Sequence, residues 1–459
     1  MSLLPVETTV GGEKQKKASS FRRNRRKKEA KKSRKGERER EREMGLPNDD
    51  VVVIRQPERP GEPSVITISC PDKTGLGCDL CRVILLFGLS IVRGDVSTDG
   101  KWCYILFWVV ERGGEATRWG LLKKRLLGAC PVPSLLLGID GYFSRQLDAE
   151  QQPQVFLLKF SCYDHLGLLH DVTQVLCELE LTIRRVNVST TPDGRVMDLF
   201  FITDTRELLH TNSRKDETCA QLKAVLGDSM TSCDIEPASA EIAACLQASS
   251  SLPHSITEEM FSVELPDEPS TGSFPAFNSL SVTMDNSLSP AHTLIQLYCH
   301  DHKGLLYDIM RTLKDYNIQI SYGRFYASHN GNCEIDLFVM QIDGKKIVDP
   351  NKQKALCDRL RMELFRPLRV MVVSRGPDTE LLVANPVELS GKGRPLVFYD
   401  ITFALKMLGT RIFLAEIGRH VIGDREWEVY RIYLGDDQEL AASRNKIVEG
   451  VTKMLMGWD

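Results

Sequence analysis

Three short turns in this sequence combine residue types that could bind a small zwitterion. Each follows an apolar run and reads Asp-x-x-Gly-Leu. A glycine lets the backbone approach a ligand, and a helix that starts there points free N–H groups at a carboxylate. The aspartate could accept a hydrogen bond from an amino group. The turns therefore predict amino-acid binding by Asp72, Thr74, Gly75, Leu76, Asp164, His165, Gly167, Leu168, Asp301, His302, Gly304 and Leu305.

The same residues also have a purely structural interpretation. An aspartate before a helix is a common N-cap that stabilises the helix by about 1 kcal/mol, and a glycine can serve the turn alone. His165 and His302, which follow the aspartates, could contact a ligand side chain or simply be solvated. The residues by themselves leave both interpretations open.

The turns belong to a repeating order of elements. In each copy a strand leads into the turn and an amphipathic helix follows, as at residues 169–179 and 305–316. A strand starting at Ile91, Ile183 or Ile320 then reaches an Asp-Gly or Asn-Gly turn, which is a strong hairpin signal. After the hairpin, a second helix is predicted at residues 117–127, 217–226 and 352–364, and a last strand at residues 134–143, 232–235 and 368–374.

This βαββαβ order predicts an α+β fold of tandem ferredoxin-like modules, with antiparallel sheets and helices on one face. A fourth, divergent copy has Ser390-Gly-Lys-Gly-Arg-Pro395 in place of Asp-x-x-Gly-Leu. Its last helix is predicted at residues 442–455, and only four residues follow that helix. We therefore expect this copy to lack its final strand, and either to have three strands or to borrow an edge strand from elsewhere.

The repeats divide the chain into segments. The sequence predicts a basic disordered extension at 1–50, module 1 at 64–146, module 2 at 153–236, a Ser/Pro-rich linker at 246–290, module 3 at 292–375 and module 4 at 379–459. The linker lacks periodicity and separates modules 1 and 2 from modules 3 and 4. It indicates a two plus two grouping.

Charge separates the head of the chain from its body. Residues 1–43 hold 16 Lys and Arg against 7 Asp and Glu, whereas the net charge of the whole chain is −3. Such a basic segment with little apolar content cannot form a core. Met44-Gly-Leu-Pro-Asn-Asp-Asp50 reads like a second start, so we give the head no functional weight. The remaining body is acidic and would repel phosphate, which makes nucleic acid an unexpected partner.

Cysteine usage and hydropathy favour a soluble protein of the cytoplasm, with the nucleus as a further option. The 13 cysteines lack the dense regular spacing of a secreted disulfide scaffold. The apolar run at residues 84–92 is far shorter than the roughly 20 residues of a membrane span, and the start of the chain has no apolar signal. Cys78-Asp-Leu-Cys81 is read as a pair of packing thiols, and no cofactor or metal is expected.

The order of elements and the Asp-x-x-Gly-Leu turns resemble those of ACT domains, and the four-copy layout resembles the plant ACT-domain repeat proteins. The segments Cys70–Arg82 and Leu455-Met-Gly-Trp-Asp459 are similar to a shorter, glutamine-sensor-like subgroup. A pair of such modules also ends the bacterial uridylyltransferase that senses glutamine. Nothing in this sequence resembles the catalytic domain of that enzyme, so the resemblance implies sensing without catalysis.

Two classes of function remain on these grounds. The first is a non-catalytic regulator that binds an amino acid, such as glutamine, and signals to an unknown protein partner. The second is an interaction scaffold whose modules bind nothing small, with a homodimer through the modules as one arrangement. In family pairs, ligands often lie between modules near the central strand, where the four copies carry Asp95, Asn187, Arg324 and Glu416. No nucleophile with its base and no carboxylate pair recurs at a spacing that predicts an enzyme.

Overall fold

The computed structural model describes residues 51–59, 61–112, 117–131, 154–191, 193–204, 206, 208–239, 252–261, 280–328, 330–376, 378–423, 425–435 and 444–457. The chain divides into two compact units, residues 1–52 and residues 53–459, and the four modules belong to the second. The predicted extension at 1–50 and the predicted last strand of module 1 at 134–143 lie outside the described residues.

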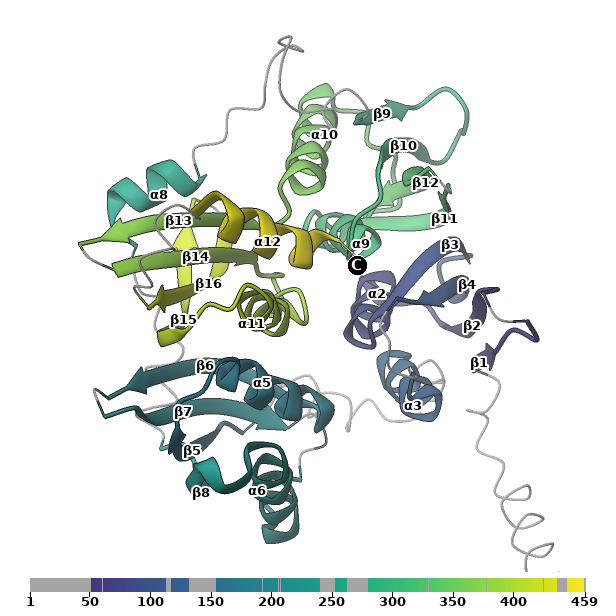
Figure 1. Cartoon of the computed structure of the whole chain (residues 1–459). Helices are drawn as coiled ribbons and strands as arrows, with labels where there is room; N and C mark the ends of the chain where they lie inside the picture. Colours follow the sequence, from purple (N-terminus) through teal and green to yellow (C-terminus); the bar gives the residue numbers. More distant parts are fainter. Residues whose placement is uncertain are drawn as a thin grey trace, which may run out of the picture. The chain divides into compact units, whose positions relative to one another are not determined.

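The predicted α+β fold is confirmed, because each module folds as strand, helix, hairpin and helix (Figure 1). Module 1 contains β2 (Ser64–Pro71), α2 (Leu76–Leu86), β3 (Leu89–Thr98), β4 (Trp102–Glu111) and α3 (Trp119–Ala129). Module 2 contains β5 (Phe156–Tyr163), α5 (Leu168–Glu178), β6 (Leu181–Thr190), β7 (Arg195–Asp204), α6 (Asn212–Leu226), a short 3-10 turn at Gly227–Ser229 and β8 (Met230–Pro237).

The second half of the chain repeats this order. Module 3 contains β10 (Thr293–His300), α9 (Leu305–Asp315), β11 (Ile318–Ala327), β12 (Asn332–Gln341) and α10 (Pro350–Phe365). Module 4 contains β14 (Asp378–Pro386), α11 (Val397–Met407), β15 (Ile412–Ile422), β16 (Arg425–Leu434) and α12 (Arg444–Met456). The four central strands share one irregularity of pairing, placed after Ile91, Ile183, Ile320 and Ile412, which marks them as copies of one unit.

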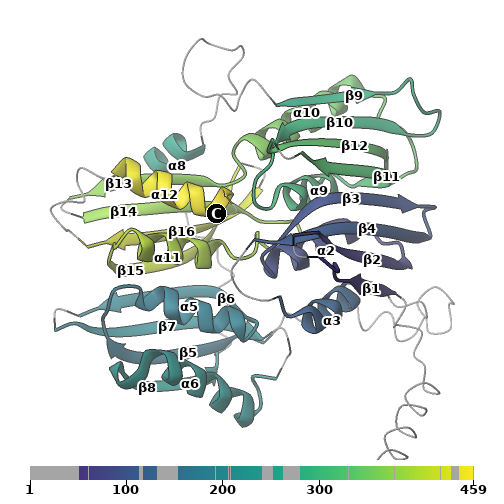
Figure 2. The same cartoon turned by 45° about the vertical axis from the view of Figure 1, so that its right-hand side comes forward.

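The modules pair across the predicted linker and not on either side of it. One eight-stranded sheet joins modules 1 and 3 in the order β1-β2-β4-β3-β11-β12-β10-β9, and a second joins modules 4 and 2 in the order β13-β14-β16-β15-β6-β7-β5-β8 (Figure 2). Central strands meet at each junction, where Arg324 lies opposite Asp95 and Glu416 lies opposite Asn187. The grouping predicted from the linker is therefore wrong: module 1 pairs with module 3, and module 2 with module 4.

The predicted last strands of modules 2 and 3 have different outcomes in the structure. In module 2, β8 pairs with β5 and confirms the predicted last strand. The corresponding prediction for module 3 is wrong, because residues 369–375 form β13 (Arg369–Arg375), which pairs with β14 of module 4. Only residues 376 and 377 separate β13 from β14, and Gly376 has φ 69°, so a local hairpin forms there. Module 4 thus borrows its edge strand, as the sequence allowed.

Short strands ahead of modules 1 and 3 take the remaining edge positions. These are β1 (Val52–Arg55), beside β2, and β9 (Ser281–Asp285), which pairs with β10. The segment predicted as an irregular linker contains β9 and also α8 (His254–Phe261). The linker prediction therefore missed both elements: β9 is stabilised by the neighbouring strand β10, and α8 by a surface of module 4 that is distant in sequence.

Apolar packing explains how the helices cover the sheets. Modules 2 and 4 share one continuous core in which Phe160, Val172 and Leu222 belong to the same cluster as Leu381 and Ile401. The helix α8 packs on the other side of β14, where Ile256 and Met260 contact a second cluster with Leu382 and Ala384. Since successive residues of a strand point to opposite faces, module 4 is covered on both faces of its sheet. Among the described residues, no helix combines the length and apolar character needed to cross a bilayer.

Candidate ligand site between paired modules

The three predicted turns have one backbone geometry. Gly75, Gly167 and Gly304 lie at φ 80°, 85° and 81°, immediately before α2, α5 and α9. This left-handed conformation costs a residue with a Cβ about 1 to 2 kcal/mol, which glycine avoids. The glycine itself is the N-cap residue, so the aspartate three positions earlier is not the helix cap that the structural interpretation predicted.

Module 4 retains the turn without its glycine. Leu396 occupies the equivalent position before α11 at φ 65° and ψ 1°. The segment Ser390–Pro395, which the sequence placed opposite the Asp-x-x-Gly-Leu motif, instead lies just ahead of the turn. The module has kept the backbone path of the turn, but with a residue that is strained there.

A second aspartate repeats in all four modules, four residues after the left-handed residue. It stands in the first helical turn as Asp79, Asp171, Asp308 and Asp400. A carboxylate is stabilised there by the free N–H groups of the helix start. Sequence analysis missed these residues, although the three motifs extended by three positions would have shown the aspartate.

Each of these aspartates binds a cation from another module. Lys314 Nζ lies 3.3 Å from Asp79 Oδ1, and Lys406 Nζ lies 2.5 Å from Asp171 Oδ1. Arg394 Nη1 lies 3.3 Å from Asp308 Oδ2, and Lys303 Nζ lies 2.8 Å from Asp400 Oδ1. The helix starts are therefore contact points between modules.

The glycines make room for these cationic side chains. An ideal Cβ on Gly75 would lie 2.7 Å from Lys314 Cδ, and one on Gly167 would lie 2.7 Å from Lys406 Cδ. On Gly304 the same atom would lie 2.9 Å from Arg394 Cζ. Glycine at each of these three turns thus suits both the left-handed backbone conformation and the close approach of the neighbouring module.

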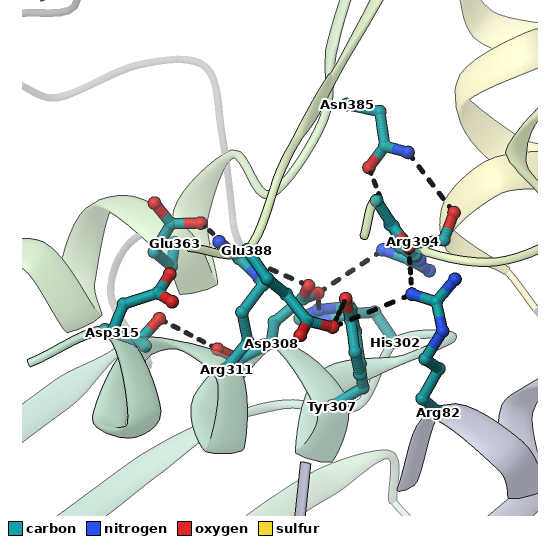
Figure 3. A network of polar contacts seen from close by, with 12 residues as sticks. Arg82, His302, Tyr307, Asp308, Arg311, Asp315, Glu363, Asn385, Glu388 and Arg394 are labelled. Atoms are coloured by element: carbon teal, nitrogen blue, oxygen red, sulfur yellow. Dashed lines mark hydrogen bonds and ion pairs between the residues drawn. The ribbon is translucent and has the colours of Figure 1, made fainter. Parts of the chain in front are cut away.

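A buried polar network continues from these contacts into module 4 (Figure 3). The Tyr307 hydroxyl donates a 2.8 Å hydrogen bond to Glu388 Oε1, and Lys314 Nζ lies 3.1 Å from Glu388 Oε2. Arg82 of module 1 lies 3.6 Å from the same carboxylate. Burial raises the pKa of Glu388, but Lys314, Ser390 and Arg82 outweigh that effect and hold it below its usual range. Glu388 is therefore an ionised anchor for modules 1 and 3.

Two small cavities open beside the turns of modules 2 and 3. The first has a volume of about 20 Å³ and is lined by Asp164, Gly167 and Asp198 from module 2, together with Lys406 and Arg411 from module 4. The second, also about 20 Å³, is lined by Asp301, His302 and Gly304 of module 3 and by Ile84 and Ser90 of module 1. Each cavity thus joins the turn of one module to the first helix and central strand of its partner.

The structure brings eight of the twelve predicted residues to these cavities. Asp164, His165, Gly167 and Leu168 line the first, and Asp301, His302, Gly304 and Leu305 line the second. Asp72, Thr74, Gly75 and Leu76 line neither. Asp72 instead accepts a 2.7 Å hydrogen bond from the Thr98 hydroxyl, and Thr74 Oγ1 lies 3.5 Å from Gln319 Nε2 of module 3.

The predicted histidines sit differently in the two cavities. His165 is exposed, with Nε2 3.3 Å from Asp171 Oδ2. His302 is half-buried, with Nε2 3.4 Å from Asp308 Oδ2. Burial raises the pKa of Asp308, yet Arg394, His302 and Arg311 together hold it below its usual range. The three leucines are core residues, with 2 to 5% of their surface exposed.

Sequence analysis missed the most unusual residue of the first cavity, Asp198. It is 1% exposed on the core-facing side of β7, and neither carboxyl oxygen has a hydrogen-bond partner. Burial is the main cause that raises its pKa well above the usual range, and Asp164 adds to the effect. A signal was available, because an acid interrupts the apolar alternation between Val196 and Phe200.

Comparison with protein-family models agrees with the modular fold. An ACR9-like, ACT-like domain model matches residues 281–378, and the C-terminal model of ACT domain-containing protein ACR9 matches residues 379–457. The N-terminal model of ACT domain-containing protein ACR10 matches residues 54–131, and the general ACT domain model matches residues 156–215.

Whole-chain relatives extend this result. ACT domain-containing protein ACR10 of Arabidopsis thaliana is 59% identical over 420 residues, which are 91% of this chain and 100% of the relative. The chain belongs to the ACT domain-containing protein family. ACR9 of the same plant is 53% identical over 90% of this chain and 100% of its own length.

The predicted relation to a bacterial enzyme is also confirmed. A bifunctional uridylyltransferase/uridylyl-removing enzyme of Gluconobacter oxydans (strain 621H) is 26% identical over 44% of this ACT-domain chain. The match covers only 19% of that enzyme. The relation is therefore to one part of the enzyme, and the names of the plant relatives mention an ACT domain and no enzymatic activity.

Proposed function

We propose that this ACT-domain chain is a non-catalytic regulatory protein that binds an amino acid, with glutamine as the first candidate, in the cavities between paired modules. Binding would stabilise one arrangement of a module pair and thereby change the affinity for a protein partner. The observation that carries the proposal is the placement of two Asp-x-x-Gly-Leu turns at equivalent cavities, one in each module pair.

The chemistry of these cavities suits a zwitterion. Each contains the aspartate of the turn, and burial raises the pKa of both Asp164 and Asp301 above the usual range. The starts of α5 and α9 offer N–H groups without intrahelical acceptors, which favour a carboxylate. At about 20 Å³ each cavity holds a group the size of one water molecule, so a whole amino acid requires the paired modules to move apart or side chains to shift.

An interaction scaffold without a small ligand is the second candidate. It is favoured by the cationic side chains that already cover the three glycines. In this reading the conserved geometry of the turns serves only to join modules, and the partner recognises an outer surface of the assembled pairs.

Titration of the full chain with glutamine and the other common amino acids separates the two candidates. We expect saturable heat in calorimetry and a rise in Tm for at least one of them; at 100 times the Kd, one bound ligand stabilises the fold by about 2.7 kcal/mol. Asp164→Asn and Asp301→Asn should each weaken binding in one cavity, whereas Asp336→Asn, on β12 away from both cavities, should not. If no amino acid gives heat or a Tm shift, the amino-acid-binding proposal fails and the interaction scaffold is the remaining candidate.

A further inference from the structure

We propose that the cavity between modules 2 and 4 receives the primary ammonium group of its ligand, and that Asp198, assisted by Thr190, is the residue that binds it. This inference rests on the proposed function, since it names the chemical group that the cavity recognises. It assigns the two cavities different roles, because the cavity between modules 1 and 3 has no counterpart of Asp198.

The position of Asp198 is the first argument. The strand register places Asp198 opposite Phe160 and Val188, on the core-facing side of β7. Counted from the shared irregularity of the central strands, the same position holds Ile105 in module 1 and Ile335 in module 3. The fold therefore tolerates an apolar side chain here, and the buried carboxyl group of module 2 is a cost to stability that the fold itself does not require.

The second argument is the absence of partners where the cavity begins. Both carboxyl oxygens of Asp198 and the Oγ1 atom of Thr190 are buried without a hydrogen-bond partner. Thr190 lies on the core-facing side of β6, opposite Val196, which neighbours Asp198 on the same side of β7. Both residues line the same cavity. These three unpaired oxygen atoms at one cavity, all of which can accept hydrogen bonds once Asp198 is ionised, form a site that a donor with several N–H groups would satisfy.

Size and charge fit an ammonium group. A volume of about 20 Å³ holds one group of the size of a water molecule, and –NH3⁺ has that size. The cationic neighbours do not pair with Asp198: Lys406 binds Asp171, and the exposed Arg411 acts on Asp164, whose pKa it lowers against the effect of burial. With the ammonium group at Asp198, the carboxylate of an amino acid lies towards Arg411 and the start of α5.

Binding must also move a proton. Burial first and Asp164 second raise the pKa of Asp198, and the nearby backbone N–H of Ser189 offsets only part of this. Without a cation beside it, Asp198 therefore favours the protonated form. On binding, R–NH3⁺ and the Asp198 carboxyl group give the carboxylate–ammonium pair and release one proton to solvent.

Other titratable groups around the cavity could also change their protonation when a ligand binds. From the module 2 turn and α5 these are Asp164, His165, His170 and Asp171, and from module 4 they are Lys406 and Arg411. His170 is buried against Tyr399 and Phe403, and burial lowers its pKa, so it is neutral at pH 7 and releases no proton there. Asp198 is thus the group whose ionisation should follow the ligand.

The test is calorimetric titration of the full chain at pH 7 in phosphate and in Tris, whose ionisation enthalpies differ. For the amino acid that binds, we expect release of about one proton per ligand. Asp198→Asn should lose this proton release and weaken binding by about 10- to 100-fold, and Thr190→Val should weaken it less. Asp234→Asn, an exposed acid on β8 of the same module, is the matched control. The N-acetylated amino acid, which lacks the ammonium group, should not bind.

The thermal stability of Asp198→Asn shows whether a loss of binding comes from the lost carboxylate or from misfolding. Because the folded chain keeps a proton on Asp198 that the unfolded chain releases above about pH 4, this group makes stability fall as pH rises. Asp198→Asn removes that loss, so its Tm at pH 7 should equal or exceed that of the unmodified chain. A variant that is folded and stable but does not bind assigns the effect to the ligand.

Other results of these experiments would overturn the ammonium site, the proposed function or both. Unchanged affinity of Asp198→Asn with no proton release overturns the ammonium site and leaves the proposed function intact. If no amino acid binds, methylammonium chloride tested against tetramethylammonium chloride still decides: a Tm rise that Asp198→Asn abolishes supports the ammonium site without the proposed function, and no rise overturns both. A Tm rise with calcium or magnesium chloride alone would make this a metal site and overturn the ammonium assignment.

Discussion

At the scale of single residues, glycine and lysine form a matched pair at the module contact. Gly75 adopts φ 80° and lies against the methylene chain of Lys314, whose ammonium group is held by Asp79 and Glu388. Withdrawal of the lysine would cost each carboxylate one of its two cations, because Asp79 would keep only Lys73 and Glu388 only Arg82. The burial of Asp79 raises its pKa, and Lys73 and Lys314 reverse this, so the carboxylate remains ionised.

We expect Gly75→Ala to lower the free energy of unfolding by more than Gly88→Ala. Both residues have positive φ, at 80° and 68°, so both variants carry the left-handed cost of about 1 to 2 kcal/mol. Only Gly75 has a neighbour within 4 Å of its ideal Cβ position. Denaturant unfolding of the two variants measures the difference, and equal losses would mean that the Lys314 side chain moves aside without cost. Gly75→Ala is for this reason a poor probe of ligand binding.

At the scale of elements, short segments owe their structure to the surface on which they lie. α8 has only eight residues, too few for a stable isolated helix, and packs Ile256 and Met260 against the outer side of β13 and β14. Phe261 also contacts Trp427, with ring centroids 4.9 Å apart. β9 and β13 likewise form because an open strand edge offers them hydrogen bonds.

Met260→Ala should detach α8 locally. Met260 is 2% exposed, and truncating a buried methionine costs about 2 to 5 kcal/mol, which is more than such a short helix can withstand. Hydrogen exchange of residues 254–261 should accelerate, while exchange of β14 changes less. Glu259→Ala, on the exposed side of the same helix, is the control. Equal exchange in both variants would show that the Met260 contact does not hold the helix.

At the scale of the whole second unit, buried charges join the two sheets. Glu363 of α10 accepts hydrogen bonds from Arg311 of α9 and from Arg425 at the start of β16. Arg311 is fully buried, and Glu363 and Arg425 are 5% and 8% exposed. This contact ties module 3, in one sheet, to module 4, in the other. Desolvated ion pairs of this kind are costly to break, because each leaves an unpaired charge.

Glu363→Gln should therefore lower the free energy of unfolding by about 3 to 5 kcal/mol, because buried Arg311 loses the nearer of its two carboxylate partners and Arg425 loses the charge of its hydrogen-bond acceptor. Glu236→Gln provides the control, since Glu236 pairs with Lys159 at an exposed position where an ion pair contributes at most about 1 kcal/mol. Thermal and urea unfolding of both variants measure the difference. A small loss for Glu363→Gln would mean that water or Asp308 compensates Arg311, and that the two sheets are only loosely coupled.

The sequence by itself determined the modules, because their signals are local. Apolar periodicity, the Asp-Gly and Asn-Gly hairpins and the glycine before each first helix specify strand, helix and turn within about 80 residues. The turn residues that line the two cavities were predicted in the same way. Asp198 and the first-turn aspartates could also have been found, because each breaks or repeats a pattern visible in the chain.

Only the tertiary structure decided how the modules combine. The pairing of module 1 with 3 and of module 2 with 4 and the docking of α8 depend on surfaces that meet across long stretches of chain, whereas β13 joins module 4 through a local hairpin. A hydrogen-bonding strand edge accepts many partners, and its choice is made by packing and buried charge over the whole assembly and not by local propensity. For the same reason, the sequence did not show which residues of module 4 line the first cavity, namely Thr402, Lys406 and Arg411.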